Sequence, residues 1–251
     1  MIELNENERL DEVNDKLKLI QKTDGLTFGT DALLLSAYIC GKYKLGCELG
    51  GGSGIISMLL LTREKLAKAD CVEVQPEYAE LIRRNSALNC LSDRLNAVCK
   101  DIRTLPKEAK YDVVYTNPPY MKTDSGFKNS DSKKNIARHE VFGDIGDFCR
   151  VGSKLLKFGG SFFAVYRPDR LTDIIFAMRE VHLEPKRITF VHARAGSESS
   201  MVLIEARLGG GVGSYLTPPL IIYDGDGYGG DMNYIMENGS FPDGFYIGNR
   251  K

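Results

Sequence analysis

The 251-residue sequence predicts an α/β protein with a mostly parallel central sheet. Short runs of β-branched and aromatic residues alternate with longer apolar-periodic segments, which is typical of strand–helix units. Three predicted strand ends carry residues suited to a ligand: a glycine-rich turn at 50–54, the acidic Glu73, and Asn117-Pro118-Pro119-Tyr120. Because ligands bind outside the carboxyl ends of strands in open α/β sheets, these observations also predict where the site lies.

The composition is that of an ordinary globular protein, with 43% hydrophobic and 27% charged residues. The length suits one sizeable α/β domain with additions better than two full domains. A net charge of −1 gives no global nucleic-acid signature, so any basic surface would be local. The N-terminus lacks a signal-peptide pattern, and no apolar run is long enough to span a bilayer. We therefore expect a cytoplasmic protein without a membrane partner.

The six cysteines include no CxxC pair, and the three histidines form no ligand-like cluster. These patterns predict buried free thiols in a reducing compartment, and no metal site.

Residues 1–44 are expected to form an N-terminal extension that completes the site. Leu10, Val13, Leu17 and Ile20 are spaced three or four apart, the helical period, and predict an amphipathic lead-in. A loop follows, and Thr30 or Asp31 could cap an apolar helix over 32–40.

A predicted strand at 45–50, a glycine turn and a helix over 55–65 come next. The dinucleotide pattern GxGxxG does not fit, because Ile55 or Ser57 occupies the third glycine position. The pattern that fits is Glu48-x-Gly50-x-Gly52-x-Gly54, where glycines let backbone approach a ligand at a helix N-terminus. On the residues alone, a plain strand–helix turn is an equally good interpretation.

The next two predicted strands, 69–74 and 95–99, each carry an acidic residue near their carboxyl end, at Glu73 and at Asp101. Glu73 lies 19 residues after Gly54, near the spacing at which such folds accept a ribose diol. The alternative is a solvated strand-end carboxylate. Pro76 opens a helix over 77–89. Asp101 follows the third strand and is a second candidate for a ligand contact. The alternative is that it caps a helix starting at Ile102.

The strand over 111–116 must end at the two prolines that follow it. The residue before a proline is extended, so the Asn117 side chain projects beyond the strand. Its Oδ1 atom and the Pro118 carbonyl would then offer two acceptors, with the ring of Tyr120 beside them. This arrangement suits a planar group that carries an NH2, such as adenine. The alternative is a Pro-Pro turn without a ligand.

The remaining chain predicts a polar lid over 121–139, a helix over 144–157 stopped by Gly159-Gly160, and a strand over 161–166. A helix over 171–181 and an antiparallel strand pair, 187–193 and 201–207, close the sheet edge. The glycine-rich extension 209–251 adds one small strand, 220–223.

These motifs, in this order, resemble the Rossmann-like class I S-adenosylmethionine methyltransferases, within the group marked by (Asn/Asp)-Pro-Pro-(Tyr/Phe). The stretches 17–35, 75–81 and 137–140 are similar to bacterial tRNA(Val) adenine-37 N6-methyltransferases of the small-domain group. The resemblance implies a methyltransferase domain over 45–208 with a seven-stranded, mostly parallel sheet and an antiparallel edge. It also implies methyl transfer from S-adenosylmethionine to the N6 amine of an adenine in nucleic acid, with tRNA as the partner.

The resemblance also implies roles for individual residues. Asn117, Pro118 and Tyr120 would be catalytic. The cofactor would be held by Glu48, Gly50, Gly52, Gly54, Glu73, Asp101 and Asn117. The segment 121–139 directly follows the Asn-Pro-Pro-Tyr motif and carries a surplus of three positive charges. We therefore expect it to contact the substrate, with contacts from Tyr120, Lys128, Lys133, Lys134 and Arg138. The alternative is a solvated loop whose lysines only keep it soluble.

Two other reactions use the same motif. A protein glutamine N5-methyltransferase usually carries a helical domain before the glycine loop, and only 47 residues precede Glu48. An adenine-N6 DNA methyltransferase would need a target-recognition domain, which this sequence does not offer. A non-catalytic binding protein is a third alternative, and no obligate protein partner is inferred.

Overall fold

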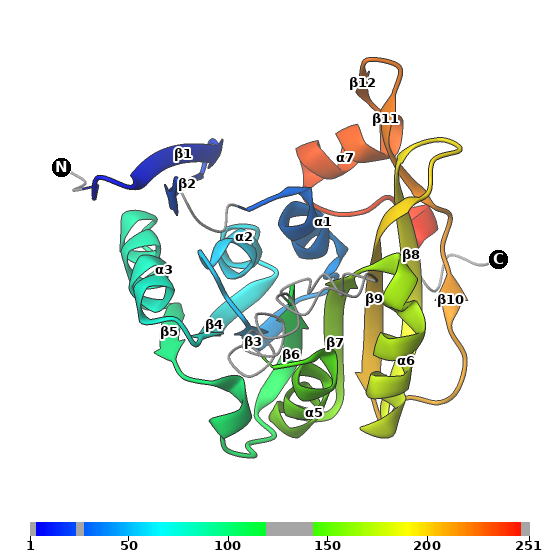
Figure 1. The fold of residues 1–251 in the computed structure, drawn as a ribbon, viewed down its shortest axis with the longest axis horizontal. Helices are drawn as coiled ribbons and strands as arrows, with labels where there is room; N and C mark the ends of the chain where they lie inside the picture. The colour runs from blue at the N-terminus through cyan, green and yellow to red at the C-terminus, as the bar shows by residue number, and fades with distance from the viewer. Residues whose placement is uncertain (1–3, 24–27, 119–142, 247–251) are drawn as a thin grey trace, which may run out of the picture.

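The computed structural model describes residues 4–23, 28–118 and 143–246. Within these ranges, ten strands form one sheet: β3 (Tyr43–Leu49), β4 (Leu66–Glu73), β5 (Leu95–Cys99), β6 (Tyr111–Thr116), β7 (Leu156–Tyr166), β8 (Leu183–Arg194), β9 (Ser199–Leu208), β10 (Tyr215–Leu216), β11 (Leu220–Asp224) and β12 (Gly227–Tyr228). Their order is β12-β11-β8-β9-β7-β6-β3-β4-β5, with β10 paired to β8 (Figure 1).

The sheet is mostly parallel, as predicted. Strands β5, β4, β3, β6 and β7 are paired in parallel, and β9 runs antiparallel between β7 and β8. These are the seven strands predicted over 45–208, and β11 is the small strand predicted at 220–223. The prediction that the antiparallel pair closes the edge is wrong, because β8 also pairs in parallel with β11, which continues into β12.

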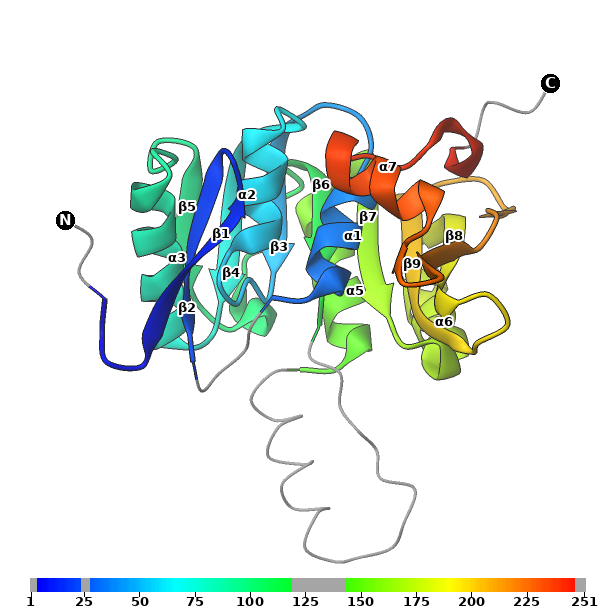
Figure 2. The same cartoon turned by 90° about the horizontal axis from the view of Figure 1, so that it is seen from above.

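Helices cover both faces of the sheet (Figure 2). One face carries α1 (Thr30–Tyr38), α2 (Ile55–Thr62), α3 (Pro76–Leu88) and α7 (Gly230–Asn238), and the other carries α5 (Ile145–Leu155) and α6 (Leu171–Glu180). The described part of the chain also contains three short 3-10 turns: η1 (Ile102–Thr104), η2 (Pro168–Arg170) and η3 (Asp243–Phe245).

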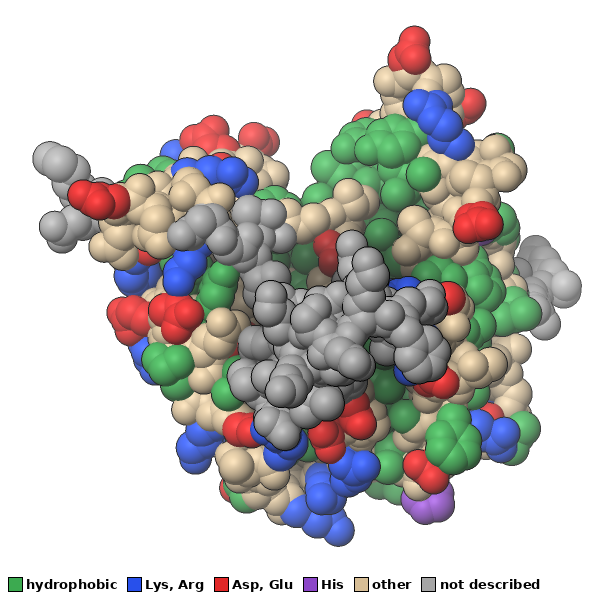
Figure 3. Space-filling view, in the orientation of Figure 1, with side chains coloured by type: hydrophobic (Ala, Val, Ile, Leu, Met, Phe, Trp, Pro, Cys, Tyr) green, Lys and Arg blue, Asp and Glu red, His purple; other side chains and the backbone are tan. Residues whose placement is uncertain are grey.

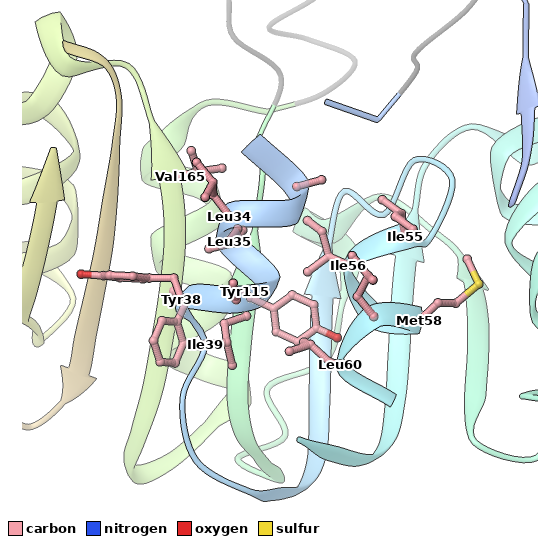
Figure 4. Packing of buried hydrophobic residues seen from close by; sticks show 14 of the residues in the cluster. Leu34, Leu35, Tyr38, Ile39, Ile55, Ile56, Met58, Leu60, Tyr115 and Val165 are labelled. Carbon is pink, nitrogen blue, oxygen red and sulfur yellow. The ribbon is translucent and has the colours of Figure 1, made fainter. Parts of the chain in front are cut away.

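The core between α1, α2 and the sheet fixes the elements that reach the site. Leu34 and Leu35 of α1, Leu60 of α2 and Tyr115 of β6 are buried in one cluster (Figure 4). Burying one such leucine contributes about 1.5–3 kcal/mol. The start of α1 and the end of β6 are therefore held in one rigid unit.

The N-terminal segment is a β-hairpin, so the predicted amphipathic helical lead-in is wrong. Strands β1 (Glu8–Asn14) and β2 (Leu17–Lys22) pair antiparallel. Two asparagine side chains, one from α3 and one at its C-cap, hydrogen-bond to the backbone of β2. Asn85 accepts a hydrogen bond from the Ile20 N–H at 2.7 Å and donates one to the Ile20 carbonyl at 3.0 Å. Asn89 accepts one from the Lys18 N–H at 3.0 Å and donates one to the Lys18 carbonyl at 2.7 Å.

The C-terminal extension is fastened to the sheet by Arg187 of β8, a feature that the sequence did not suggest. The Arg187 side chain is 1% exposed, and its guanidinium lies 3.7 Å from the centre of the Tyr38 ring. It donates hydrogen bonds to Glu205 at 2.9 Å, to the Tyr38 carbonyl at 2.7 Å and to the Phe245 carbonyl at 3.2 Å. The segment around η3 therefore completes the shell of a buried charge.

Several local predictions need correction. The N-cap of α1 is Gly29, rather than Thr30 or Asp31. The pair Gly159-Gly160 lies within β7, while α5 already ends at Leu155 after starting with a capping box at Asp144. The cysteines are free, but Cys90 and Cys99 are exposed rather than buried.

Two findings concern membranes and metals. No helix in the described part of the chain is long and apolar enough to cross a membrane. Over the same residues, no group of three or more His, Cys, Asp or Glu side chains is placed to hold a metal ion.

Candidate active site

The carboxyl ends of four adjacent parallel strands meet at one edge of the sheet. The register pairs Thr116 with Leu49, and Leu49 with Val72. It also pairs Glu73 with Cys99. Asn117, Gly50, Glu73 and Asp101 therefore follow one another along this edge, which is where open α/β sheets bind ligands.

The glycine turn uses backbone angles that favour glycine. Gly50, Gly52 and Gly54 have φ of +75°, +54° and +80°. A Cβ atom built on Gly52 would meet nothing within 4 Å, so the space in front of this backbone is open. A Cβ on Gly51 would lie 2.1 Å from the Cys71 sulfur, so this glycine is required by packing. The turn thus combines a tightly packed base with an open face at Gly52.

Glu73 is tied to this turn. Its Oε2 atom accepts a hydrogen bond from the Gly52 N–H at 2.9 Å, and its Oε1 atom accepts one from the Gln75 N–H at 2.9 Å. The side chain is 5% exposed, so the alternative of a solvated carboxylate is wrong. The carboxylate therefore sits beside the open face of the glycine turn.

Glu48 lies beneath the turn and faces α2. Its Oε2 atom accepts hydrogen bonds from the Ser57 N–H at 3.1 Å and from the Ser57 hydroxyl, which also lies 2.7 Å from the Tyr115 hydroxyl. Burial raises the pKa of Glu48 to about 7. These contacts join β3 to α2, and the role of Glu48 in holding the cofactor stays a prediction.

Asp101 caps η1, as the alternative interpretation of the sequence expected. Its carboxylate accepts hydrogen bonds from the Arg103 N–H at 2.9 Å and from the Arg103 guanidinium at 2.5 Å. These bonds to Arg103 lower the pKa of Asp101. The role of Asp101 in holding the cofactor stays a prediction.

Asn117 contacts a residue that was not predicted to belong to the site. Its Nδ2 atom donates a hydrogen bond to Oδ2 of Asp31 at 2.8 Å, across 86 residues of chain. Its Oδ1 atom is buried and has no hydrogen-bond partner among the described residues. The following Pro118 is buried as well. In the sequence, Asp31 stood out only as a helix-cap candidate, because the contact depends on the approach of α1 to β6.

The other predicted substrate contacts, Tyr120, Lys128, Lys133, Lys134 and Arg138, lie outside the described residues, as does the whole of the predicted lid over 121–139. Figure 3 shows one face of the molecule, in the orientation of Figure 1. On its described surface, acidic and basic side chains are interspersed, in keeping with the net charge of −1.

Comparisons with known proteins agree on the type of domain. Residues 23–168 match the family model described as the methyltransferase small domain. A tRNA1(Val) (adenine(37)-N6)-methyltransferase of Phocaeicola vulgatus is 31% identical over 179 residues, which cover 70% of this chain and 74% of that protein. A protein of the same name from Porphyromonas gingivalis is 29% identical over 212 residues, covering 80% and 82%.

Among solved structures, a predicted O-methyltransferase of Agrobacterium tumefaciens superposes with a TM-score of 0.70. The alignment covers 84% of this chain and 98% of that one at 22% identity. At this identity, the superposition shows that the two proteins share the fold.

Proposed function

The chain belongs to the methyltransferase small-domain family, and from this premise we propose that it transfers a methyl group from S-adenosylmethionine to the N6 amine of an adenine in tRNA. The relatives named for adenine 37 of tRNA1(Val) support that position as the target. The observation that carries the proposal is the buried Asn117 Oδ1 atom, which has no partner among the described residues. A buried acceptor left unpaired costs about 1–3 kcal/mol, and a substrate N–H would relieve this cost.

The residues at the sheet edge fit the cofactor. The open face of Gly52 would accept its methionine part, together with Gly50 and Gly54. Glu73 would accept the ribose hydroxyls, and Asp101 would face the adenine amine. When bound, S-adenosylmethionine supplies a methyl group on a positively charged sulfur that leaves with the electron pair of the bond.

The residues of the chain would overcome the weak nucleophilicity of the substrate. The lone pair of an adenine N6 amine is delocalised into the ring. By accepting hydrogen bonds from the two N–H groups of this amine, Asn117 Oδ1 and the Pro118 carbonyl would favour a pyramidal nitrogen with the lone pair directed at the methyl group. Positioned polar groups of this kind contribute several kcal/mol, and the loss of one oxyanion-hole donor costs roughly 3–4 kcal/mol. After transfer, N6 releases one proton to solvent, so no strong base is needed beforehand.

Other segments would complete the substrate site. The extension 1–44 supplies Asp31 to Asn117, which supports its role in the site. We propose that Tyr120 stacks on the unstacked base and that 121–139 contacts the RNA backbone. With tRNA as the substrate, the protein would act in the cytoplasm.

Methyl-transfer assays test this proposal. Labelled S-adenosylmethionine is offered with separate tRNA, DNA and protein pools, and the products are analysed as nucleosides or amino acids. We expect the label in N6-methyladenosine of the tRNA pool. A tRNA1(Val) transcript with guanosine at position 37 is the control, and we expect no label in it. Label confined to DNA, or to glutamine of the protein pool, would overturn the proposal.

A further inference from the structure

Asp31 and Asn117 form a hydrogen-bonded pair at the carboxyl edge of the sheet. We infer that Asp31 is a positioning residue for methyl transfer, whose carboxylate fixes the rotation of the Asn117 amide so that Oδ1 faces the substrate amine. This inference rests on the proposed function, since it concerns the acceptor that the proposal uses.

The chemistry of the two groups selects one orientation. An asparagine amide can present either its oxygen or its NH2 to a site, since the two ends have nearly the same shape. An ionised carboxylate only accepts hydrogen bonds, so the end that faces Asp31 must be the NH2. The Asn117 oxygen then points away from Asp31. A rotated amide would oppose two oxygens and offer the substrate amine a donor instead of an acceptor.

Both partners are held by rigid structure. The second oxygen of Asp31, Oδ1, accepts a hydrogen bond from the Ala32 N–H at 2.9 Å. Asp31 also lies in the first turn of α1, where the helix dipole favours a negative charge. On the other side, the hydroxyl of Thr116 donates to the Leu49 carbonyl at 2.8 Å and ties the end of β6 to β3. The Asn117 amide is therefore hydrogen-bonded to the start of α1, and the strand that carries it is fixed to the sheet.

The charge of Asp31 has a second effect. In the transition state the amine nitrogen gains positive charge as its bond to carbon forms. A carboxylate one hydrogen bond away polarises the Asn117 amide and strengthens Oδ1 as an acceptor for that amine. Asparagine at position 31 would lose this charge. It could also donate, so it would no longer select a single orientation of the Asn117 amide.

The test compares Asp31→Ala, Asp31→Asn, Asn117→Ala and the double variant Asp31→Ala/Asn117→Ala. Asp231→Ala is the matched control, since Asp231 is an exposed acid in the first turn of α7. Single-turnover methylation measures the chemical step, and calorimetry measures S-adenosylmethionine affinity. Amide NMR of the cofactor-free protein follows the side-chain NH2 signal of Asn117, assigned by its loss in Asn117→Ala.

We expect Asp31→Ala to slow the chemical step by about tenfold or more, with cofactor affinity within about twofold. Asp31→Asn should fall between Asp31→Ala and the wild type. In the Asn117→Ala background, removing Asp31 should have almost no further effect, because the two residues act as one unit. The Asn117 NH2 signal should shift in Asp31→Ala and stay unchanged in Asp231→Ala.

Three results would overturn the inference: an unchanged chemical step in Asp31→Ala, losses that multiply in the double variant, or a loss carried entirely by cofactor affinity. These outcomes are distinct from failure of the proposed function, which would appear as a wild-type protein that does not methylate tRNA adenine.

Discussion

The backbone N–H of Gly52 donates a hydrogen bond to the Glu73 carboxylate at 2.9 Å, which joins the turn after β3 to the tip of β4. This hydrogen bond couples the positions of the two proposed cofactor contacts. Substitutions in the turn should therefore weaken cofactor affinity more than they slow the chemical step.

Gly52→Val should abolish most S-adenosylmethionine binding, because the side chain would fill the open space in front of this backbone. Calorimetry on the folded variant checks this. Gly159→Val is the matched control, since Gly159 also has a positive φ and open space but lies in β7 away from the strand tips. Undiminished affinity in Gly52→Val would place the cofactor elsewhere.

Asn117→Ala should lower kcat strongly and leave cofactor affinity nearly intact, because the acceptor acts in the transition state.

Tyr120→Ala should cost about 1–3 kcal/mol in kcat/KM, the usual contribution of base stacking. Steady-state kinetics and calorimetry separate the two effects. Equal losses of cofactor binding in both variants would indicate a structural role instead.

Glu48 should make stability depend on pH. Burial raises its folded-state pKa to about 7 from 4.5. The folded state therefore holds the proton that the unfolded state has lost, and the free energy of unfolding falls as pH rises from 4.5 to 7. Between pH 5 and 8, wild type should lose up to about 3 kcal/mol more than Glu48→Gln. Urea titrations check this, with the exposed Glu237→Gln as control. Parallel pH profiles for wild type and Glu48→Gln would contradict it.

The predicted lid should contribute to tRNA binding through charge. For a single-stranded region, removing one lysine that binds a phosphate reduces the log-log salt slope of binding by about 0.7. Replacing Lys128, Lys133 and Lys134 with serine should flatten the slope by up to roughly 2 units and leave cofactor affinity unchanged. Binding titrations over a range of salt concentrations check this.

The control for this triple variant replaces three exposed lysines at the opposite, amino-terminal edge of the sheet, Lys42, Lys44 and Lys68. If the lid variant keeps the wild-type slope and full activity, the RNA surface lies elsewhere, and Lys16, Lys18 and Lys22 become the next candidates.

Arg187→Ala should lower the free energy of unfolding by about 3–5 kcal/mol, because it leaves Glu205 and two carbonyls without their buried partner. Arg179→Ala removes a surface pair with Glu184 and should cost about 0–1 kcal/mol. Chemical denaturation distinguishes them. A similar small loss in both would mean that the buried pair adds little.

Local patterns were enough to predict much of the sheet. The strands over 95–99 and 111–116 have the predicted bounds, since each is a short apolar run closed by a charged residue or a proline. The N-terminal hairpin was not predictable from spacing. Leu10, Val13, Leu17 and Ile20 fit a helix equally well, and the choice is made by Asn85 and Asn89, 65 and 71 residues away from their partners.

In the candidate site, too, some residues could be predicted from local patterns and others could not. Gly52 and Glu73 could be predicted because each follows a strand at a recognisable spacing. Asp31 could not be predicted as a site residue, because its contact with Asn117 depends on how α1 packs, and the sequence shows only an acid near a helix start. The clasp of Arg187 on the Phe245 carbonyl is equally non-local, since 58 residues separate the two.

That clasp has a consequence for the order in which the molecule is made on the ribosome. Chains emerge from their N-terminus, so β8 and β9 leave the exit tunnel before the segment around Phe245. Until that segment arrives, the guanidinium of Arg187 lacks one of its carbonyl partners and the ring of Tyr246. The shell around Arg187 can therefore be completed only after the segment around Phe245 has been synthesised, later than the strand tips that form the proposed active site.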